Sequence, residues 1–221
     1  MSSIFDIMGP VMIGPSSSHT AGAAKLGQIA RYIFADNIEK ADIKLHGSFA
    51  TTYRGHGTDR AVVGGILGFR PDDERIKNSL EIAEQRGVEI NISTVELRDV
   101  HPNTLLIELK NKDNEVKMLG SSIGGSNIKV VQINDHRVNI SGQLPTLWVI
   151  HKDRPGMVGI ITSLLGSYQL NIANMQDFRM KKGSTGSSII ELDQKVEEAI
   201  VNHLEKIDDI YQVRYIPPLS N

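Results

Sequence analysis

The sequence predicts an α+β fold in two domains, residues 1–142 and 146–221. In the first range, apolar residues at helical spacing alternate with short strand-like segments. Glycine and proline interrupt this pattern at 141–145. In the second range, the pattern is strand, helix, strand, strand, helix, strand. A chain of 221 residues with 40% hydrophobic content is long enough for two such domains.

Three helices are expected in the first domain. Apolar side chains recur at helical spacing over 21–35, with polar residues on the other side. A glycine-containing apolar helix is expected at 58–69. The third helix, at 72–86, follows Pro71, carries acidic residues at its start and stops at Gly87.

Short strands make up the rest of this domain. Ile43 and Leu45 alternate with polar residues as a first strand. Turns at 112–114 and 134–136 are expected to join neighbouring strands as hairpins. The glycine-rich segment 120–126 is expected to be a flexible loop, which is only a weak indication of a ligand site. The other strands are expected at 89–97, 105–110, 116–119, 128–133 and 138–140.

The second domain is expected to have the ferredoxin-like βαββαβ order. A turn at 152–156 follows its first strand, and a glycine turn at 181–186 separates its second and third strands. Because helices cover one face of such a sheet, the other face or an edge is left for a partner, and pairing between copies is expected. The expected bounds are 146–151, 157–168, 171–180, 187–192, 195–206 and 210–216.

Composition limits the classes of function. A formal charge of -2 argues against a nucleic-acid partner. No apolar run reaches the ~18–20 residues of a membrane helix, and the start resembles neither a signal peptide nor a transit sequence, so a cytoplasmic location is expected. The sequence contains no cysteine, which excludes disulfides, thiolate nucleophiles and cysteine ligands for zinc or iron–sulfur clusters.

A heptapeptide before the first helix combines hydroxyl groups with an imidazole: Gly14-Pro15-Ser16-Ser17-Ser18-His19-Thr20. Ser17, Ser18 or Thr20 is expected to be the N-cap, but capping needs only one hydroxyl. First-turn N–H groups lack partners inside the helix, and they favour an anion by about 0.3–1 kcal/mol. His19 adds a proton donor or acceptor. The segment has neither the lysine of a nucleotide P-loop nor the G-x-S-x-G of a nucleophile elbow.

A first resemblance concerns the second domain. The turn Asp153-Arg154-Pro155-Gly156-Met157-Val158-Gly159, with Asn171-Ile172-Ala173-Asn174-Met175 beginning the next strand, resembles an ACT domain. In that family these two segments frame an amino-acid site at a dimer interface. The resemblance therefore implies that Gly156 and Asn171 bind an allosteric ligand and that copies self-associate. A structural domain with a vestigial site is the alternative, because a shared fold does not carry function.

A second resemblance concerns the first domain. It is carried by Ile4-Phe5-Asp6-Ile7-Met8-Gly9-Pro10, Ile13-Gly14-Pro15-Ser16-Ser17-Ser18-His19-Thr20-Ala21-Gly22, Gly47-Ser48-Phe49-Ala50 and Arg54-Gly55-His56-Gly57-Thr58-Asp59-Arg60-Ala61. These segments closely resemble the beta chain of the bacterial iron–sulfur L-serine dehydratase, and the resemblance covers nearly the full length. It implies that the first domain is of the allosteric substrate-binding type, also found in some 3-phosphoglycerate dehydrogenases.

This resemblance implies a lyase, L-serine ammonia-lyase, which forms pyruvate and ammonia from L-serine without pyridoxal phosphate. In that family a [4Fe–4S] cluster with one open iron acts as a Lewis acid on the hydroxyl group. Because this chain has no cysteine, the cluster is expected on a separate, cysteine-bearing alpha chain. The chain itself is then expected to bind no metal and to be active only with that partner.

The resemblance also implies roles for individual residues. His19 is expected to contact the amino or carboxyl group of L-serine. His56 is the candidate for proton delivery to the departing hydroxyl, although without the resemblance it would be interpreted as a surface turn residue. The expected substrate-binding residues are Ser16, Ser17, Ser18 and Thr20, together with Thr58 and Asp59, which would orient His56.

Two other functions are considered. A free-standing amino-acid-binding regulatory protein would bind an amino acid without any cluster-bearing partner. A regulatory part of a dehydrogenase is disfavoured, because no G-x-G-x-x-G fingerprint opens a strand–helix unit. Co-purification of an iron-containing, cysteine-bearing chain in the absence of oxygen would favour the dehydratase.

Overall fold

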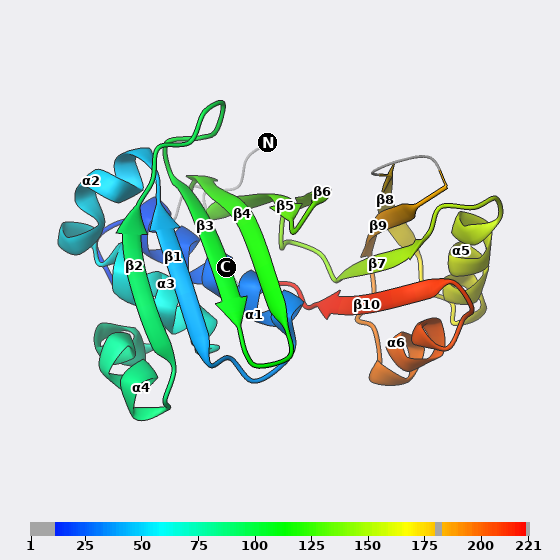
Figure 1. The fold of residues 1–221 in the computed structure, drawn as a ribbon, viewed down its shortest axis with the longest axis horizontal. Coiled ribbons are helices and arrows are strands. Elements are labelled where there is room, and N and C mark those ends of the chain that lie inside the picture. The colour runs from blue at the N-terminus through cyan, green and yellow to red at the C-terminus, as the bar shows by residue number, and fades with distance from the viewer. Residues whose placement is uncertain (1–11, 180–182, 220–221) are drawn as a thin grey trace, which may run out of the picture. The chain divides into compact units, whose positions relative to one another are not determined.

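The computed structural model describes residues 12–179 and 183–219, which form an α+β fold with two sheets (Figure 1). The chain divides into two compact units between Val130 and Val131. Strand β6 (His136–Ile140) belongs to the second unit, where it contacts strands β8 (Ile172–Arg179) and β9 (Thr185–Leu192). The domain ranges 1–142 and 146–221 stay predictions. The quoted segment 4–10 lies outside the described residues.

Two helices form the core of the first unit. Helix α1 spans Ala23–Phe34, within the range that the periodicity predicts, and helix α3 spans Thr58–Ile66. Glycines allow their backbones to approach closely: a Cβ atom on Gly65 would lie 2.0 Å from the carbonyl oxygen of Ala24. The two helices therefore pack as one layer, and α1 also contacts strands β3 (Thr104–Lys110) and β4 (Glu115–Gly124).

Strands β1, β3 and β4 cover this layer, as part of a six-stranded sheet whose order is β2-β1-β3-β4-β5-β6. Figure 1 shows α1 and α3 behind its strands β1, β3 and β4. Strand β1 pairs in parallel with β2 and antiparallel with β3, and its residues alternate between half-buried and buried. Besides β6, the sheet consists of β1 (Lys40–Leu45), β2 (Glu89–Thr94), β3 (Thr104–Lys110), β4 (Glu115–Gly124) and β5 (Asn127–Ile133).

Helix α2, Gly47–His56, was not predicted by the sequence pattern. Its segment is rich in Ser, Thr and Gly, and Phe49 is its one buried residue, so neither propensity nor an apolar stripe indicates a helix. Gly47 begins it with φ +57°, where a Cβ atom would lie 2.6 Å from the Pro102 carbonyl oxygen. The interpretation of His56 as a surface turn residue is therefore wrong: His56 ends α2, Gly57 follows at φ +66°, and α3 begins at Thr58.

The expected glycine loop at 120–126 is also corrected. Strand β4 continues through Gly124, and Ser121 and Ser122 are buried within it. The Ser121 hydroxyl lies 2.7 Å from that of Thr104 on the neighbouring strand β3. Pairing with β3 thus extends a strand through residues of low strand propensity.

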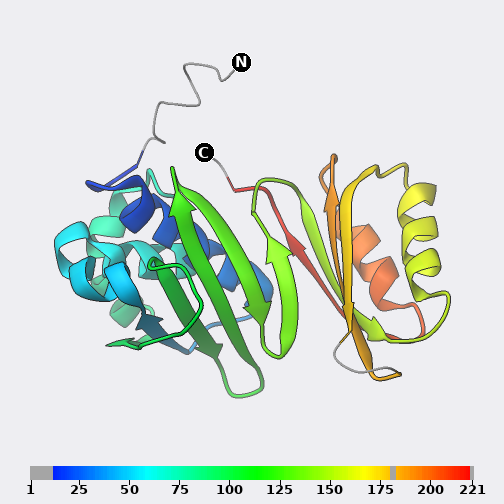
Figure 2. The same cartoon turned by 90° about the horizontal axis from the view of Figure 1, so that it is seen from above.

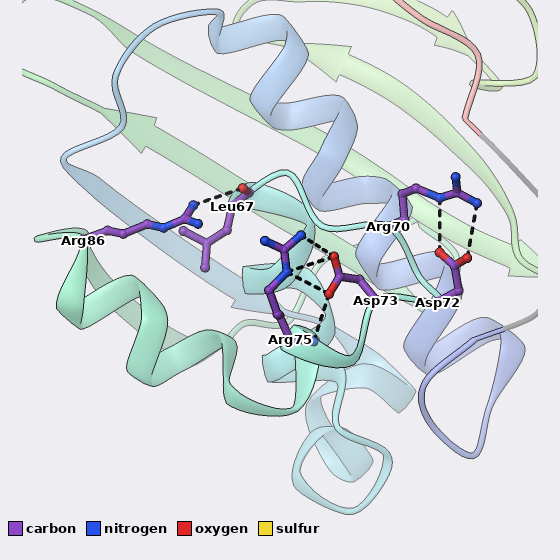
Figure 3. A network of polar contacts seen from close by, with 6 residues as sticks. All are labelled: Leu67, Arg70, Asp72, Asp73, Arg75 and Arg86. Atoms are coloured by element: carbon purple, nitrogen blue, oxygen red, sulfur yellow. Dashed lines mark hydrogen bonds and ion pairs between the residues drawn. The ribbon is translucent and has the colours of Figure 1, made fainter.

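The third predicted helix is divided in two. A 3₁₀ helix, η3, spans Glu74–Asn78, and helix α4 spans Ser79–Gln85. Asp73 caps η3 by accepting the Arg75 N–H at 3.0 Å, and its carboxylate also pairs with the Arg75 guanidinium (Figure 3). This cap lets η3 begin as a tight turn after the loop at Pro71.

The second unit contains the predicted strand, helix, strand, strand, helix, strand order. Its four-stranded sheet has the order β10-β7-β9-β8, and each neighbouring pair is antiparallel. Both helices contribute buried residues to one hydrophobic core with strand β7, and Figure 2 shows them on one side of the sheet. The elements are β7 (Thr146–Lys152), α5 (Met157–Ser167), β8 (Ile172–Arg179), β9 (Thr185–Leu192), α6 (Glu198–Glu205) and β10 (Ile210–Ile216).

A polar network joins β7, β8 and β9. The buried His151 places Nε2 3.1 Å from Asp177 Oδ1 and 3.0 Å from Ser188 Oγ. The Ser188 hydroxyl also donates to Asp177 at 2.6 Å. The hydrogen bond to Asp177 raises the pKa of His151, although burial opposes this. Burial works to raise the pKa of Asp177, but the hydrogen bonds from His151 and Ser188 hold it below its usual value.

We expect the second unit to lose stability as pH rises through the folded-state pKa of His151. Because the pKa of His151 is raised in the folded state, the His151–Asp177 pair contributes fully to the free energy of unfolding below the pKa of the unfolded state, about 6.5. This contribution is lost as the pH rises above the pKa of the folded state. Asp177→Asn should lower the free energy of unfolding by about 1 kcal/mol near pH 6, since the carboxylate is partly exposed. The substitution should also flatten the pH profile.

Urea unfolding followed by the fluorescence of Trp148, the single tryptophan, measures this effect. The matched control is Asp208→Asn, which removes an exposed carboxylate outside the network. Equal pH dependence of unfolding in the wild type and in Asp177→Asn would contradict the prediction.

Candidate functional site

The serine-rich motif forms a π-helical turn, η2, at Ser17–Gly22, which continues into α1. The N-cap is Ser16, whose hydroxyl accepts the His19 N–H at 3.2 Å. The predicted caps Ser17, Ser18 and Thr20 are therefore wrong, because the helical turn begins earlier than the apolar periodicity does. Single π-helical turns are rare and occur often at functional sites.

The His19 ring has neighbours at both nitrogens. Its Nε2 atom lies 3.1 Å from the Ser48 hydroxyl, and its Nδ1 atom lies 3.4 Å from the Ser16 hydroxyl. The ring also contacts the edge of Phe49, with centroids 5.1 Å apart. Burial, and then the nearby His56, lower the pKa of His19, so its imidazole is mostly neutral at pH 7. These contacts hold the ring in one orientation.

Ser48 and Phe49 were not predicted to be site residues. The signal was available, because both lie in the quoted segment 47–50. Their contact with His19 depends on α2 being a helix that starts at Gly47, where the Ser48 N–H donates to the Pro102 carbonyl at 2.9 Å.

The structure brings the two predicted motifs together. The rings of His19 and His56 lie 4.8 Å apart, and the Thr20 hydroxyl donates to the His56 carbonyl at 3.1 Å. The His56 Nδ1 atom is buried and has no hydrogen-bond partner among the described residues, and the same holds for the hydroxyl of Thr58. A buried polar atom without a partner is costly, so these two atoms are available to a bound group.

The remaining predicted substrate-binding residues differ in their surroundings. Ser17 and Ser18 lie in the first turn, half-buried, and their hydroxyls form no hydrogen bond within residues 12–179 and 183–219. The Asp59 carboxylate accepts the Arg60 N–H at 2.8 Å. No hydrogen bond or ion pair joins Asp59 to His56 in the part of the chain that the structure describes, and the role of Asp59 in orienting this ring stays a prediction.

The two predicted allosteric residues lie in the second unit. Gly156 precedes α5 with φ +92°, and both it and Asn171 are exposed. The Asn171 side chain donates to Asp193 at 2.5 Å, and its N–H donates to Gln194 at 2.8 Å.

A cavity of about 280 Å³ adjoins the motif in the first unit. Thr20 and His56 line it together with three cationic side chains, Arg54, Arg60 and Lys77. One wall is the segment beginning at Ile13, whose N–H donates to the Pro71 carbonyl at 2.8 Å. Through Thr20 and His56, the cavity adjoins both predicted motifs.

The residues of this chain do not fit an iron–sulfur cluster. Such clusters are held by thiolates, and the sequence contains no cysteine. Among the described residues, no group of three or more His, Asp or Glu side chains is arranged to hold a metal ion. In the same residues, no helix has the length and apolar character needed to cross a membrane.

Comparison with known proteins identifies the family. Residues 3–132 match the family model described as "Serine dehydratase beta chain". The probable L-serine dehydratase beta chain of Bacillus subtilis (strain 168) is 41% identical, and the L-serine dehydratase beta chain of Peptoniphilus asaccharolyticus is 38% identical. Each alignment covers 97% of both chains.

A more distant similarity extends to another class of protein. The D-3-phosphoglycerate dehydrogenase of Bacillus subtilis (strain 168) is 23% identical over 88% of this chain but over only 37% of its own length. The family model covers more than half of the chain and two beta chains align with nearly all of it, so this chain belongs to the serine dehydratase beta chain family.

Proposed function

We propose that this chain is the beta subunit of an L-serine dehydratase, which converts L-serine to pyruvate and ammonia. The contact between His19 and His56 is the observation that carries the proposal. It joins two separate motifs and leaves the buried Nδ1 atom of His56 without a partner in the described residues. The two beta-chain relatives support the same activity by their names.

A separate, cysteine-bearing alpha chain holds the [4Fe–4S] cluster in this proposal. The thiolates that such a cluster requires are absent from this chain. This chain then contributes substrate contacts and proton transfer, and it is active only when assembled with the alpha chain.

The carboxylate of L-serine binds at the start of η2. The hydroxyls of Ser17 and Ser18, which have no hydrogen-bond partner among the described residues, and the first-turn N–H groups suit an anion there. Ser16 and Ser48 hold the neutral His19 ring against the amino or carboxyl group.

The proton for the departing hydroxyl comes from His56. Hydroxide is a poor leaving group, and protonation of its oxygen allows it to leave as water. Thr20 anchors the backbone of His56 through its hydrogen bond, and the buried hydroxyl of Thr58 has no partner among the described residues. Asp59 helps to set the first turn of α3 beside this ring.

The second unit acts as a regulatory ACT domain. Its βαββαβ order and antiparallel four-stranded sheet support this proposal, as does the glycine at positive φ before α5. Gly156 and Asn171 would frame an amino-acid site at an interface between copies. The first domain is then of the allosteric substrate-binding type.

The test is co-expression, without oxygen, with a candidate cysteine-bearing alpha chain. We expect the two chains to co-purify with iron and to form pyruvate from L-serine, while each chain alone forms none. A chain that binds an amino acid but neither assembles nor yields pyruvate would instead be a free-standing regulatory protein. That result would contradict the proposed function.

A further inference from the structure

We propose that Ser16 is a positioning residue that holds His19 in the neutral tautomer with its proton on Nε2. The inference deepens the proposed function and rests on it, because the tautomer decides what His19 can do in the dehydratase site. Ser16 was expected to bind substrate, together with its neighbours in the motif. Its hydroxyl instead faces two atoms of one residue, the backbone nitrogen and the Nδ1 atom of His19.

The Ser16 hydroxyl has one hydrogen to donate, and the Nδ1 atom of His19 is the acceptor within reach. The hydroxyl oxygen accepts the backbone N–H of His19 at 3.2 Å and lies 3.4 Å from Nδ1. A hydroxyl group carries one donor hydrogen and two acceptor lone pairs. If Nδ1 carried the imidazole proton, the oxygen would accept twice and the hydroxyl hydrogen would have no acceptor among the described residues. Donation from Ser16 to the Nδ1 lone pair uses both groups, so Nδ1 is the unprotonated nitrogen.

The second nitrogen of the ring then carries the proton. A neutral imidazole has one donor and one acceptor nitrogen, so an unprotonated Nδ1 places the hydrogen on Nε2. Nε2 lies 3.1 Å from the Ser48 hydroxyl, whose oxygen accepts this hydrogen. Burial, and then the nearby His56, lower the pKa of His19, which disfavours the form protonated on both nitrogens. Ser48 fits either tautomer, because a hydroxyl can donate or accept, so Ser16 decides between them.

The acceptor for Nε2 is itself held in place. The Ser48 N–H donates to the Pro102 carbonyl at 2.9 Å, and the Ser48 carbonyl accepts the Thr52 hydroxyl at 2.8 Å. The ring of the buried Phe49 lies 5.1 Å from that of His19, at an interplanar angle of 78°. A half-turn of the His19 ring would place carbon atoms opposite both hydroxyls, so these contacts fix the orientation in which the tautomer is read.

The tautomer limits the part that His19 plays in the reaction. Its Nδ1 lone pair is used by Ser16 and its Nε2 hydrogen by Ser48, so neither nitrogen is free to take a proton from L-serine. The neighbouring His56 differs, because its Nδ1 atom has no hydrogen-bond partner among the described residues. Of the two rings, His56 then moves the proton, and His19 contributes fixed contacts.

Long-range ¹H–¹⁵N correlation NMR of the full chain, labelled with ¹⁵N and measured without a partner, reads the tautomer directly. The signals of His19 are identified among those of the seven histidines by their absence from His19→Gln. We expect the hydrogen on Nε2 in the wild type. Ser16→Asp should shift the ratio of the two tautomers toward the form protonated on Nδ1 by roughly tenfold or more, because a carboxylate only accepts hydrogen bonds. Ser16→Thr keeps the hydroxyl and should keep the wild-type ratio.

The matched control is Ser17→Asp, which adds the same charge to the same turn at a side chain without a hydrogen bond to His19 in the described residues. Asp caps a helix about as well as Ser does, so Ser16→Asp should retain the turn, and circular dichroism verifies folding. A wild-type proton on Nδ1, or equal tautomer ratios in Ser16→Asp and Ser17→Asp, would overturn the proposal. The measurement uses no turnover, so its failure is distinguishable from a failure of the dehydratase function.

Discussion

His56→Ala in the assembled enzyme is expected to lower kcat for L-serine by about 10²–10⁴-fold, the usual contribution of a positioned proton donor. His56 lies at the end of α2 with its ring 4.8 Å from that of His19, and no other described side chain in this site has a buried ring nitrogen without a partner. Alanine removes the proton donor while the Thr20 hydroxyl keeps its hydrogen bond, because that bond is to the backbone carbonyl of residue 56.

The kinetic comparison separates proton transfer from binding. His19→Ala should mainly raise KM, because both nitrogens of His19 already face hydroxyls and its role is contact with the substrate. His203→Ala, an exposed substitution in the second unit, is the control. Pyruvate formation at saturating L-serine measures kcat in each variant. Near-wild-type turnover in His56→Ala would show that proton delivery lies elsewhere.

Gly65→Ala is expected to be the most destabilising single-methyl change in the first unit, by about 3 kcal/mol or more. The new Cβ atom would lie 2.0 Å from the Ala24 carbonyl oxygen and 2.9 Å from the Gln28 nitrogen. Both are backbone atoms of α1, so no side chain can rotate away and the two helices must separate. Because η2 leads directly into α1, the same displacement should also move His19 and lower activity.

Urea unfolding followed by far-ultraviolet circular dichroism measures the loss. Gly55→Ala is the matched control, because it makes the same change within helix α2, where no described atom outside the adjoining helix backbone lies within 4 Å of the new Cβ. It should be neutral, or stabilising by up to about 1 kcal/mol through helix propensity. Equal unfolding free energies for the two variants would contradict the close packing of α1 and α3.

Much of the secondary structure followed from local pattern. Helix α1 and the order of elements in the second unit were predicted, because their apolar residues recur at a clear spacing and glycine and proline mark the ends of the elements. Helix α2 and the end of β4 were missed, because their residues have weak propensities for the structures that they form. Packing of Phe49 and pairing of Ser121 with Thr104 decide these segments, and both depend on distant parts of the chain.

The sequence by itself determined that this chain lacks the thiolates of an iron–sulfur site, and its motifs indicated the serine dehydratase beta chain family. Only the tertiary structure decided which groups meet. Ser48 reaches His19 because α2 begins at Gly47, and Arg54, Arg60 and Lys77 surround one cavity because three elements converge there. Such contacts join residues far apart in the chain, so they depend on helix packing and strand register, which no local pattern of residues specifies.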